Sequence, residues 1–311
     1  MLLNKMDKSQ ILTYLQEVMP GEYGENVPMS KHTSFRIGGP ADILVMPSSA
    51  AQLQAVVKMV RASALPLTII GNGSNLLVRD KGIRGVVIKL GTALKEVTVE
   101  GEKVKAGAGT LLGALAGQTA NLGLSGLEFA AGIPGSLGGA VVMNAGAYDG
   151  EIKKVLEAVT VLLPTGEFAR LTSAELDLNY RHSIFQTAPY KEYIITGVEL
   201  ALHSKPVAEI KAVIEDYTQR RISKQPLELP SGGSMFKRPP GYFAAALIDE
   251  AGLRGFTVGG AQVSTKHTGF VVNVGNATAK DVLSLIKEVQ AKIFALKGIK
   301  LEPEVRIMGE E

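Results

Sequence analysis

The feature that most constrains the fold is a 20-residue segment, residues 129–148, with the sequence FAAGIPGSLGGAVVMNAGAY. It carries no charge, and a helix of that length would span a bilayer. Its five glycines and one proline disfavour such a helix, because both residue types destabilise helix interiors. The flanking residues, Glu128 and Asp149, are acidic rather than basic. We therefore expect a segment whose main chain packs closely against a ligand or against another segment.

The composition fits a globular protein with room for two domains. The chain has 311 residues, of which 46% are hydrophobic and 20% are charged. The net charge of +3 and the lack of a basic run argue against a nucleic-acid partner. The absence of cysteine excludes disulfides, thiolate catalysis and iron–sulfur clusters. It fits a reducing compartment, and the N-terminal residues lack a signal-peptide pattern, so we expect a cytoplasmic protein without membrane insertion.

Hydrophobic periodicity predicts an α+β chain rather than a regular βαβ alternation. The predicted helices are 9–19, 48–63, 110–123, 205–226, 243–251 and 279–296. The predicted strands and hairpins are 41–47, 65–78, 84–90, 95–109, 155–171, 192–200, 269–275 and 302–308, with a glycine-rich loop at 231–242. Ser48 or Ser49 is expected to cap the second helix, and Thr278 with Asp281 to form a capping box on the last.

A second glycine-containing loop, residues 71–76, follows an apolar strand. Its spacing resembles the start of a dinucleotide-binding fingerprint, but Leu76 stands where a third glycine is required, and no βαβ unit follows. Main-chain amides freed by glycine, together with small polar side chains, suit a pyrophosphate or another anion. The alternative is an ordinary turn.

Three further motifs carry side chains suited to catalysis. Arg181, in NYRHSIFQ, offers a planar donor fork for a carboxylate or phosphate, although a lone arginine is more often a surface residue. Ser234, in SGGSMFKRPPGY, follows two glycines but does not form a G-x-S-x-G elbow. In LEPEVRIM, strand alternation places Glu302, Glu304 and Arg306 on one face and does not separate the two acids.

The four histidines, at positions 32, 182, 203 and 267, are scattered along the chain. None pairs with another ligand at helical spacing, so we expect no metal site. His267, in STKHTGF, lies in a polar cluster beside an apolar strand. A structural hydrogen-bonding role and a site role are equally compatible with that position.

Taken in order, these motifs resemble the UDP-N-acetylenolpyruvoylglucosamine reductase family, flavoenzymes that make UDP-N-acetylmuramate for bacterial cell walls. The matching elements are HTSFRIGGPAD, GNGSNLLV, AGIPGSLGGAVVMNAGAY, YRHSIF, GGSMFK, AGLRG, GGAQVSTKHTGFVVN and LEPEVR. The resemblance implies an FAD-binding fold of the vanillyl-alcohol-oxidase (PCMH) type followed by an α+β substrate-binding domain. The short gap between Arg181 and the serine loop resembles the family's second structural type.

The implied domains are a helical lead at 1–31, an FAD-binding domain at 32–200 and a substrate-binding domain at 201–311 whose last strand can return to the FAD domain. The implied cofactor is non-covalent FAD, with NADPH and an enolpyruvyl UDP-sugar as substrates of a monomer. Two rival interpretations are an FAD-dependent oxidase of a sugar or alcohol on the same fold, and a non-catalytic nucleotide-sugar binding protein.

The resemblance also implies roles for individual residues. Catalysis falls to Arg181, Ser234 and Glu304, the last because it directly precedes Val-Arg. The implied FAD-binding residues are Gly71, Asn72, Gly73, Ser74, Asn75, Leu76, Gly132, Ile133, Pro134, Gly135, Ser136, Gly138, Gly139, Asn144 and Gly146. The implied substrate-binding residues are Tyr180, Lys237, Arg238, Gln262 and His267.

Two residues depart from the family's usual pattern. Arg238 replaces an asparagine that often follows the Phe-Lys of the serine motif, and Thr268 replaces the alanine of Lys-His-Ala-Gly. Both are expected near the substrate. Lys237 is hypothesised to stabilise the Ser234 oxygen as it loses its proton.

Overall fold

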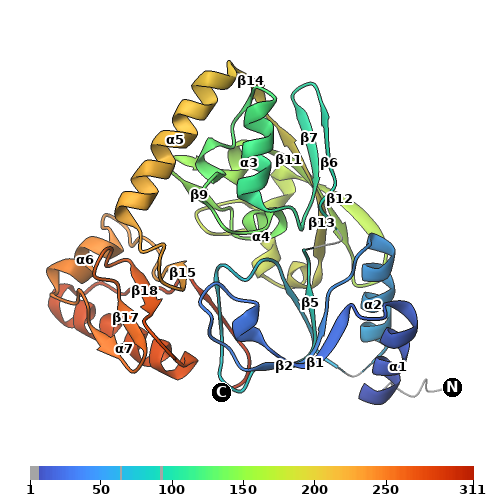
Figure 1. Ribbon diagram of the computed structural model, residues 1–311, viewed down its shortest axis with the longest axis horizontal. Coiled ribbons are helices and arrows are strands. Elements are labelled where there is room, and N and C mark those ends of the chain that lie inside the picture. The colour runs from blue at the N-terminus through green and yellow to red at the C-terminus, as the bar shows by residue number, and fades with distance from the viewer. Residues whose placement is uncertain (1–6, 64, 92–93) are drawn as a thin grey trace. The chain divides into compact units, whose positions relative to one another are not determined.

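The computed structural model describes residues 7–63, 65–91 and 94–311, and the chain divides into two compact units (Figure 1). Unit 1 contains the chain up to Glu25 together with Ile43–Asn72 and Gly85–Gln219. Unit 2 contains Asn26–Asp42, Gly73–Arg84 and Arg220–Glu311. Both units are therefore discontinuous in sequence.

One part of unit 1 is a pair of helices, α1 (Lys8–Val18) and α2 (Ala50–Ala62), which lie side by side (Figure 1). Asp7 and Gln10 cap α1 reciprocally, and Ser49 caps α2 by accepting from the Gln52 amide. The strand β3 (Leu67–Ile70) pairs in parallel with the later residues of β5 (Ile83–Lys89). The apolar faces of these elements form one buried cluster.

The second part of unit 1 is a five-stranded antiparallel sheet in the order β12-β11-β13-β7-β6. Its strands are β6 (Val97–Glu100), β7 (Lys103–Gly107), β11 (Leu156–Leu162), β12 (Phe168–Thr172) and β13 (Ile194–Ala201). The helices α3 (Leu112–Asn121) and α4 (Leu137–Val142) share a buried apolar cluster with this sheet, which fixes where α4 lies.

Short elements complete unit 1. The pairs β8 (Leu124–Ser125) with β14 (His203–Ser204) and β9 (Gly146–Ala147) with β10 (Gly150–Glu151) are antiparallel. The 3₁₀ turns in unit 1 are η2 (Glu128–Ala130), η3 (Ile152–Lys154), η4 (Ser173–Leu176), η5 (Ile184–Gln186) and η6 (Tyr190–Glu192). The chain passes from one unit to the other within the strands β1 (Tyr23–Pro28), β2 (Pro40–Val45) and β5, within the helix α5 (Val207–Lys224), and in a loop between Asn72 and Gly73.

Unit 2 is built on an antiparallel sheet in the order β15-β18-β17-β16. Its strands are β15 (Ser231–Ser234), β16 (Thr257–Val258), β17 (Ala261–Val263) and β18 (Phe270–Asn273). The helices α6 (Ala244–Glu250) and α7 (Ala279–Lys297) share its buried apolar cluster, and the turn η1 (Met29–Lys31) precedes the loop of Phe35. The last strand, β19 (Arg306–Met308), pairs in parallel with β4 (Leu76–Val78).

The predicted helices are confirmed with small shifts at their ends, and Thr278 with Asp281 forms the predicted capping box of α7. Residues 129–148 contain the six-residue helix α4, whereas their glycines argued only against a helix that spans a membrane. Two predictions about local structure were wrong. The predicted loop 231–242 begins with β15, and the predicted strand 302–308 is a strand only from Arg306 onward, because each pairing depends on a partner distant in sequence.

Within the described part of the chain, no helix is both long and apolar enough to cross a membrane. The uncharged segment 129–148 folds into short turns, α4 and β9, and its apolar side chains join the core of unit 1.

Candidate functional site

In unit 1, two glycine-containing loops predicted to bind a cofactor lie against each other. The Asn72 side chain donates a hydrogen bond to the Pro134 carbonyl oxygen at 2.5 Å. A Cβ atom at Gly71 would lie 2.2 Å from the Ser136 hydroxyl oxygen, so a larger residue fits only if that hydroxyl moves. The structure therefore brings the first two residues of the loop 71–76 together with residues 134–136.

The helix α4 begins directly after residues 134–136, and a glycine in its first turn allows it to pack closely against another segment. Ser136, which is buried, caps α4 by accepting from the Gly139 amide at 3.4 Å. A Cβ atom at Gly138 would lie 2.8 Å from the Cβ of Ala108, and the Gly138 amide donates to the Ala108 carbonyl. At Gly138, tight packing of two segments accounts for the glycine without any ligand.

A buried hydroxyl lies beside these loops. Thr110 is 7% exposed, and its carbonyl accepts from the Leu137 amide at 2.8 Å. Among the residues that the structure describes, the Thr110 Oγ1 has no hydrogen-bond partner. A buried hydroxyl without a partner is uncommon in folded proteins and points to a further polar group at that place. The region therefore has a donor available for a cofactor.

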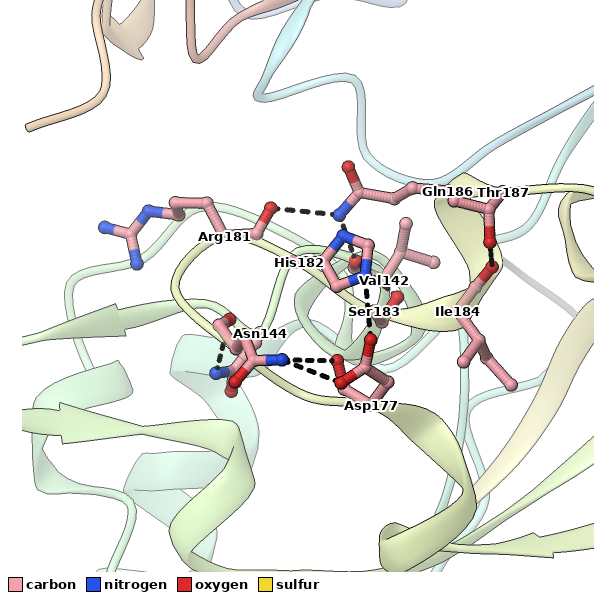
Figure 2. A network of polar contacts seen from close by, with 10 residues as sticks. Val142, Asn144, Asp177, Arg181, His182, Ser183, Ile184, Gln186 and Thr187 are labelled. Carbon is pink, nitrogen blue, oxygen red and sulfur yellow. Dashed lines mark hydrogen bonds and ion pairs between the residues drawn. The ribbon is translucent and has the colours of Figure 1, made fainter.

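Arg181 lies at the tip of a tight turn. Asn179 and His182 close this turn through two main-chain hydrogen bonds, and Arg181 adopts a left-handed φ of +54°. Its guanidinium donates to the Gly146 carbonyl at 3.0 Å and lies 5.1 Å from the ring centroid of Tyr180. Figure 2 shows this side chain extending away from His182 and Asp177. The structure thus brings Arg181 to the end of the glycine-rich segment.

Asn144, predicted to contact the cofactor, is fully buried and makes its contacts within the protein. Its amide donates to Glu151 and to the Asn179 carbonyl, each at 3.0 Å, and its oxygen accepts from the Lys153 amide at 2.9 Å. The structure therefore places Asn144 as a link between the glycine-rich segment and the turn of Arg181.

In unit 2, the rest of the loop 71–76 meets the segments that carry the candidate serine and glutamate. The Ser34 hydroxyl is within hydrogen-bond distance of the Ser231 carbonyl at 2.7 Å and the Ser74 carbonyl at 3.3 Å. The Asn75 side chain donates to the Glu304 carbonyl at 3.2 Å. These contacts join residues separated by as many as 229 positions and form one cluster within unit 2.

A bulge presents Ser234 to solvent. The register between β15 and β18 shifts between Ser231 and Ser234, and Gly233 in between adopts a φ of +83°. Bulges of this kind re-aim the side chain that follows them. Ser234 is exposed, whereas Met235 and Phe236 directly after it are buried in the core of unit 2. The serine is thus an accessible hydroxyl on a firmly anchored strand.

The C-terminal acids differ in their surroundings, which the sequence did not reveal. Glu302 is mostly exposed, and its carboxylate pairs with the Lys237 ammonium at 2.5 Å. Glu304 is partly buried, and its main-chain amide donates to the Met235 carbonyl at 2.8 Å. Glu304 therefore lies beside the strand of Ser234, while Lys237 is engaged with Glu302 instead of with the serine.

His267 is partly buried against Phe270, with the ring centroids 5.2 Å apart. Its Nδ1 accepts from the Gly269 amide at 3.1 Å. Burial, and to a smaller extent the positive charges of Arg254 and Lys224, lowers the pKa of His267 from its ordinary value of 6.5. This imidazole is therefore neutral near pH 7, with Nε2 carrying the proton.

The remaining predicted substrate-binding residues and the two departures also have contacts within unit 2. The Gln262 amide donates to the Thr257 hydroxyl at 3.0 Å, and the Arg238 guanidinium carbon lies 4.5 Å from the ring centroid of Phe243. Thr268 is buried, and its hydroxyl donates to the Ala245 carbonyl at 2.7 Å. The side chain of Thr268, one of the two departures from the family pattern, therefore makes its hydrogen bond within the protein.

Four residues of these clusters were not singled out by the sequence: Ser34, Thr110, Ser183 and Gln186. Ser34 lies in the matched motif HTSFRIGGPAD, Ser183 lies in YRHSIF and Gln186 follows it directly, but none was given a role, because their partners Ser231 and Val142 are distant in sequence. Thr110 lies in an apolar stretch, and its hydroxyl has no described partner. Within the described ranges, no group of acidic or histidine side chains is arranged to hold a metal ion.

Comparison with known proteins covers nearly the whole chain. Residues 41–172 match the family model described as FAD binding domain, and residues 225–308 match that described as UDP-N-acetylenolpyruvoylglucosamine reductase, C-terminal domain. The UDP-N-acetylenolpyruvoylglucosamine reductase of Agathobacter rectalis is 53% identical, over 92% of this chain and 94% of that protein.

Two solved structures are similar. The crystal structure of UDP-N-acetylenolpyruvylglucosamine reductase from Thermus caldophilus is 40% identical, covers 92% of this chain and 98% of that chain, and superposes with a TM-score of 0.80. An alkyldihydroxyacetonephosphate synthase is 16% identical over 66% of this chain and 42% of its own, with a TM-score of 0.50, a likeness of fold alone. The predicted fold, of the vanillyl-alcohol-oxidase (PCMH) type with an α+β substrate-binding domain, is confirmed.

Proposed function

The chain belongs to the UDP-N-acetylenolpyruvoylglucosamine reductase family, and we propose that Arg181, Ser234 and Glu304 act directly on its substrate. It is an FAD-dependent oxidoreductase of peptidoglycan synthesis, which reduces the enolpyruvyl ether of UDP-N-acetylglucosamine to UDP-N-acetylmuramate. NADPH is the proposed source of the hydride.

The loops that meet in each unit fit an FAD-binding role. In unit 1, Asn72 ties one loop to Pro134 of the other, and the Thr110 hydroxyl lies buried beside them without a described partner. In unit 2, the main chain of Ser74 and Asn75 is held by Ser34 and the C-terminal segment. FAD, when bound, supplies the hydride that is transferred to the methylene carbon of the enolpyruvyl group.

Arg181 is proposed to stabilise the negative charge that develops on the substrate. Addition of hydride to the methylene carbon drives electron density onto the neighbouring carbon and its carboxylate. A guanidinium is permanently charged and matches a carboxylate with two donors, so it suits this purpose. The tight turn and the bond to Gly146 fix the side chain in advance, and such preorganised charge is usually the largest electrostatic contribution to catalysis.

Ser234 is proposed to donate the proton that completes the reduction. The carbon next to the carboxylate must receive a proton, and a hydroxyl within reach can supply it although its intrinsic pKa is high. The exposure of Ser234 on an anchored, bulged strand makes its hydroxyl accessible to a substrate. Glu304, partly buried beside that strand, is proposed to orient the carboxylate region of the substrate.

The observation that carries this assignment is the cluster in unit 2. Ser34 and Asn75 tie the cofactor loop both to the strand that ends at Ser234 and to the main chain of Glu304. The same cluster favours Glu304 over Glu302, because Glu302 is exposed and neutralised by Lys237. With that pairing, Lys237 is no longer favoured as the group that stabilises the serine oxygen.

The test separates the two halves of the reaction. In Ser234→Ala, anaerobic reduction of the flavin by NADPH should proceed at the wild-type rate, because no substrate proton is involved. Reoxidation of the reduced flavin by the enolpyruvyl UDP-sugar should slow by roughly 10²- to 10⁴-fold. Stopped-flow absorbance of the flavin measures both rates.

Ser231→Ala is the matched control, because Ser231 lies in the same strand and its hydroxyl accepts only weakly from the Gly233 amide at 3.5 Å. Its reoxidation rate should stay near that of the wild type. Equal slowing of both half-reactions in Ser234→Ala would contradict the assigned role. Failure of NADPH to bleach the flavin, with reduction by a sugar or alcohol instead, would favour an oxidase.

A further inference from the structure

Arg181 adopts a main-chain conformation that needs support from outside its own turn. A positive φ is rare for residues other than glycine, and it persists where surrounding contacts determine it. The two hydrogen bonds between Asn179 and His182 close the turn but do not orient it relative to the rest of unit 1. Besides the bond from the Arg181 guanidinium to Gly146 and the contacts of Asp177 with Asn179 and His182, such contacts come from three side chains, Gln186, Ser183 and Asn144 (Figure 2).

The Gln186 side chain contacts both the turn of Arg181 and the end of α4. Its Nε2 donates to the Arg181 carbonyl at 3.0 Å and to the Val142 carbonyl at 2.9 Å. Val142 is the last residue of α4, and the last carbonyls of a helix lack partners within the helix. One amide group therefore joins the main chain of Arg181 to the end of α4.

Ser183 and Asn144 make two further links between the turn of Arg181 and residues 142–144. The Ser183 hydroxyl, which is fully buried, donates to the same Val142 carbonyl at 2.7 Å. The Asn144 amide donates to the Asn179 carbonyl on the opposite side of the turn at 3.0 Å. Three side chains thus fix the turn of Arg181 to residues 142–144, directly after the glycine-rich loop.

We propose that Gln186 is a positioning residue, which with Ser183 and Asn144 holds Arg181 where its guanidinium meets the substrate. The inference rests on the proposed role of Arg181. Gln186 does not touch the substrate itself; it acts through the main chain of the arginine. Because small displacements of a positioned charge cost up to two orders of magnitude in rate, loss of the Gln186 contacts should be visible in the step that uses Arg181.

The test uses Gln186→Met in the FAD-loaded enzyme, since methionine keeps the length of the side chain and removes both donor contacts. Reoxidation of the reduced flavin by the enolpyruvyl UDP-sugar should slow on the order of 10- to 100-fold. Flavin reduction by NADPH, FAD content and melting temperature should stay near the wild type. In steady-state assays kcat should fall more than KM rises, because the contact acts on the transition state.

Thr187→Val is the matched control. Thr187 is the next residue and donates to the Ile184 carbonyl at 2.9 Å, a side-chain bond of the same kind that does not reach Arg181 or Val142. Its two half-reactions should match those of the wild type. If Gln186→Met folds poorly, Ser183→Ala tests the same link from the other donor to Val142.

The double variant decides whether Gln186 acts through the arginine. In an Arg181→Ala background, Gln186→Met should cause no further slowing of reoxidation, since coupled residues are not additive. Additive slowing would overturn the inference, as would equal slowing of both half-reactions or a loss of FAD. A normal Gln186→Met alongside a slow Arg181→Ala would reject the inference and leave the role of Arg181 intact, whereas a normal Arg181→Ala would reject both.

Discussion

At the scale of single residues, the buried hydroxyl of Thr110 leads to a prediction about two quantities. Its removal should raise the stability of the FAD-free protein and lower the affinity for FAD. Thr110→Val replaces a hydroxyl without a described partner by a methyl group of similar size. The FAD-free protein should gain about 1 kcal/mol of unfolding free energy, because a buried unsatisfied polar group is removed. FAD affinity should fall about 5- to 10-fold, because a donor to the cofactor is lost. Thermal unfolding and quenching of flavin fluorescence measure the two effects.

Thr119→Val is the control for this pair of measurements. Thr119 is fully buried, but its hydroxyl already has acceptors in the carbonyls of Leu115 and Ala116, at 3.0 and 3.1 Å. Valine there should leave FAD affinity unchanged and should not stabilise the protein. An unchanged FAD affinity in Thr110→Val would show that the hydroxyl does not serve the cofactor.

His267 predicts a dependence of stability on pH. Because its pKa is lowered in the folded protein, the unfolded chain binds a proton at higher pH than the folded one does. The stabilising contribution of the neutral imidazole is therefore complete above the ordinary value of 6.5 and is lost as pH falls below it. His267→Asn keeps an acceptor for the Gly269 amide and does not titrate, so its melting temperature should fall less than that of the wild type between about pH 7.5 and 5.5. An identical loss in both proteins would assign the acid sensitivity to other groups.

At the scale of elements, the start of α7 receives a cap from a distant part of the chain. Both carboxylate oxygens of Asp80 accept from main-chain amides of the first helical turn, those of Ala279 and Lys280, at 2.8 and 2.9 Å. This cap adds to the capping box of Thr278 and Asp281 and places negative charge at the positive end of the helix dipole.

Asp80→Ala should therefore lower the free energy of unfolding by about 1 to 2 kcal/mol, as removal of a helix cap does. Asp80→Asn should lose less, since it keeps one acceptor. Asp249→Ala is the comparison within the same unit, because it removes an exposed ion pair with Arg254 and should cost less than about 1 kcal/mol. Denaturant unfolding measures all three variants, and equal losses for Asp80→Ala and Asp249→Ala would contradict the capping role.

Elements with local signals were predictable, and those with remote partners were not. The limits of α7 follow from a capping box and a final glycine that lie within or next to the helix. The strand β15 and the late start of β19 depend on Phe270 and Leu76, which no local pattern connects to them. Gly138 shows the same limit: its reason is the side chain of Ala108, thirty positions earlier in the chain.

The residues of the candidate site were predicted from sequence motifs, whereas their surroundings were not. Arg181, Ser234 and Glu304 came from resemblance to a family, and their assigned roles stay predictions. The environments of Glu302 and Glu304 separate the two acids, which strand alternation left equivalent. The supporting side chains, Ser34 and Gln186 among them, were missed because a polar residue reveals its purpose only when its partner is known.

At the scale of the whole molecule, the sequence was divided into contiguous domains, with a boundary at residue 200 that stays a prediction. The compact units of the structure are instead assembled from separate stretches. Composition and periodicity read along a chain do not reveal that residues 26–42 and 73–84 share a core with residues 220–311. That arrangement follows only from contacts such as those of Ser34 with Ser231 and of Asp80 with α7.

The pairing of β4 with β19 has a consequence for how the protein is made. The ribosome synthesises β4 long before its parallel partner β19, since Leu76 pairs with Arg306. Contacts between such distant residues make folding slow and leave apolar segments waiting while the rest of the chain is synthesised. Leu77, fully buried in the folded protein, therefore lacks its pairing partner, Ile307, until that residue has been synthesised.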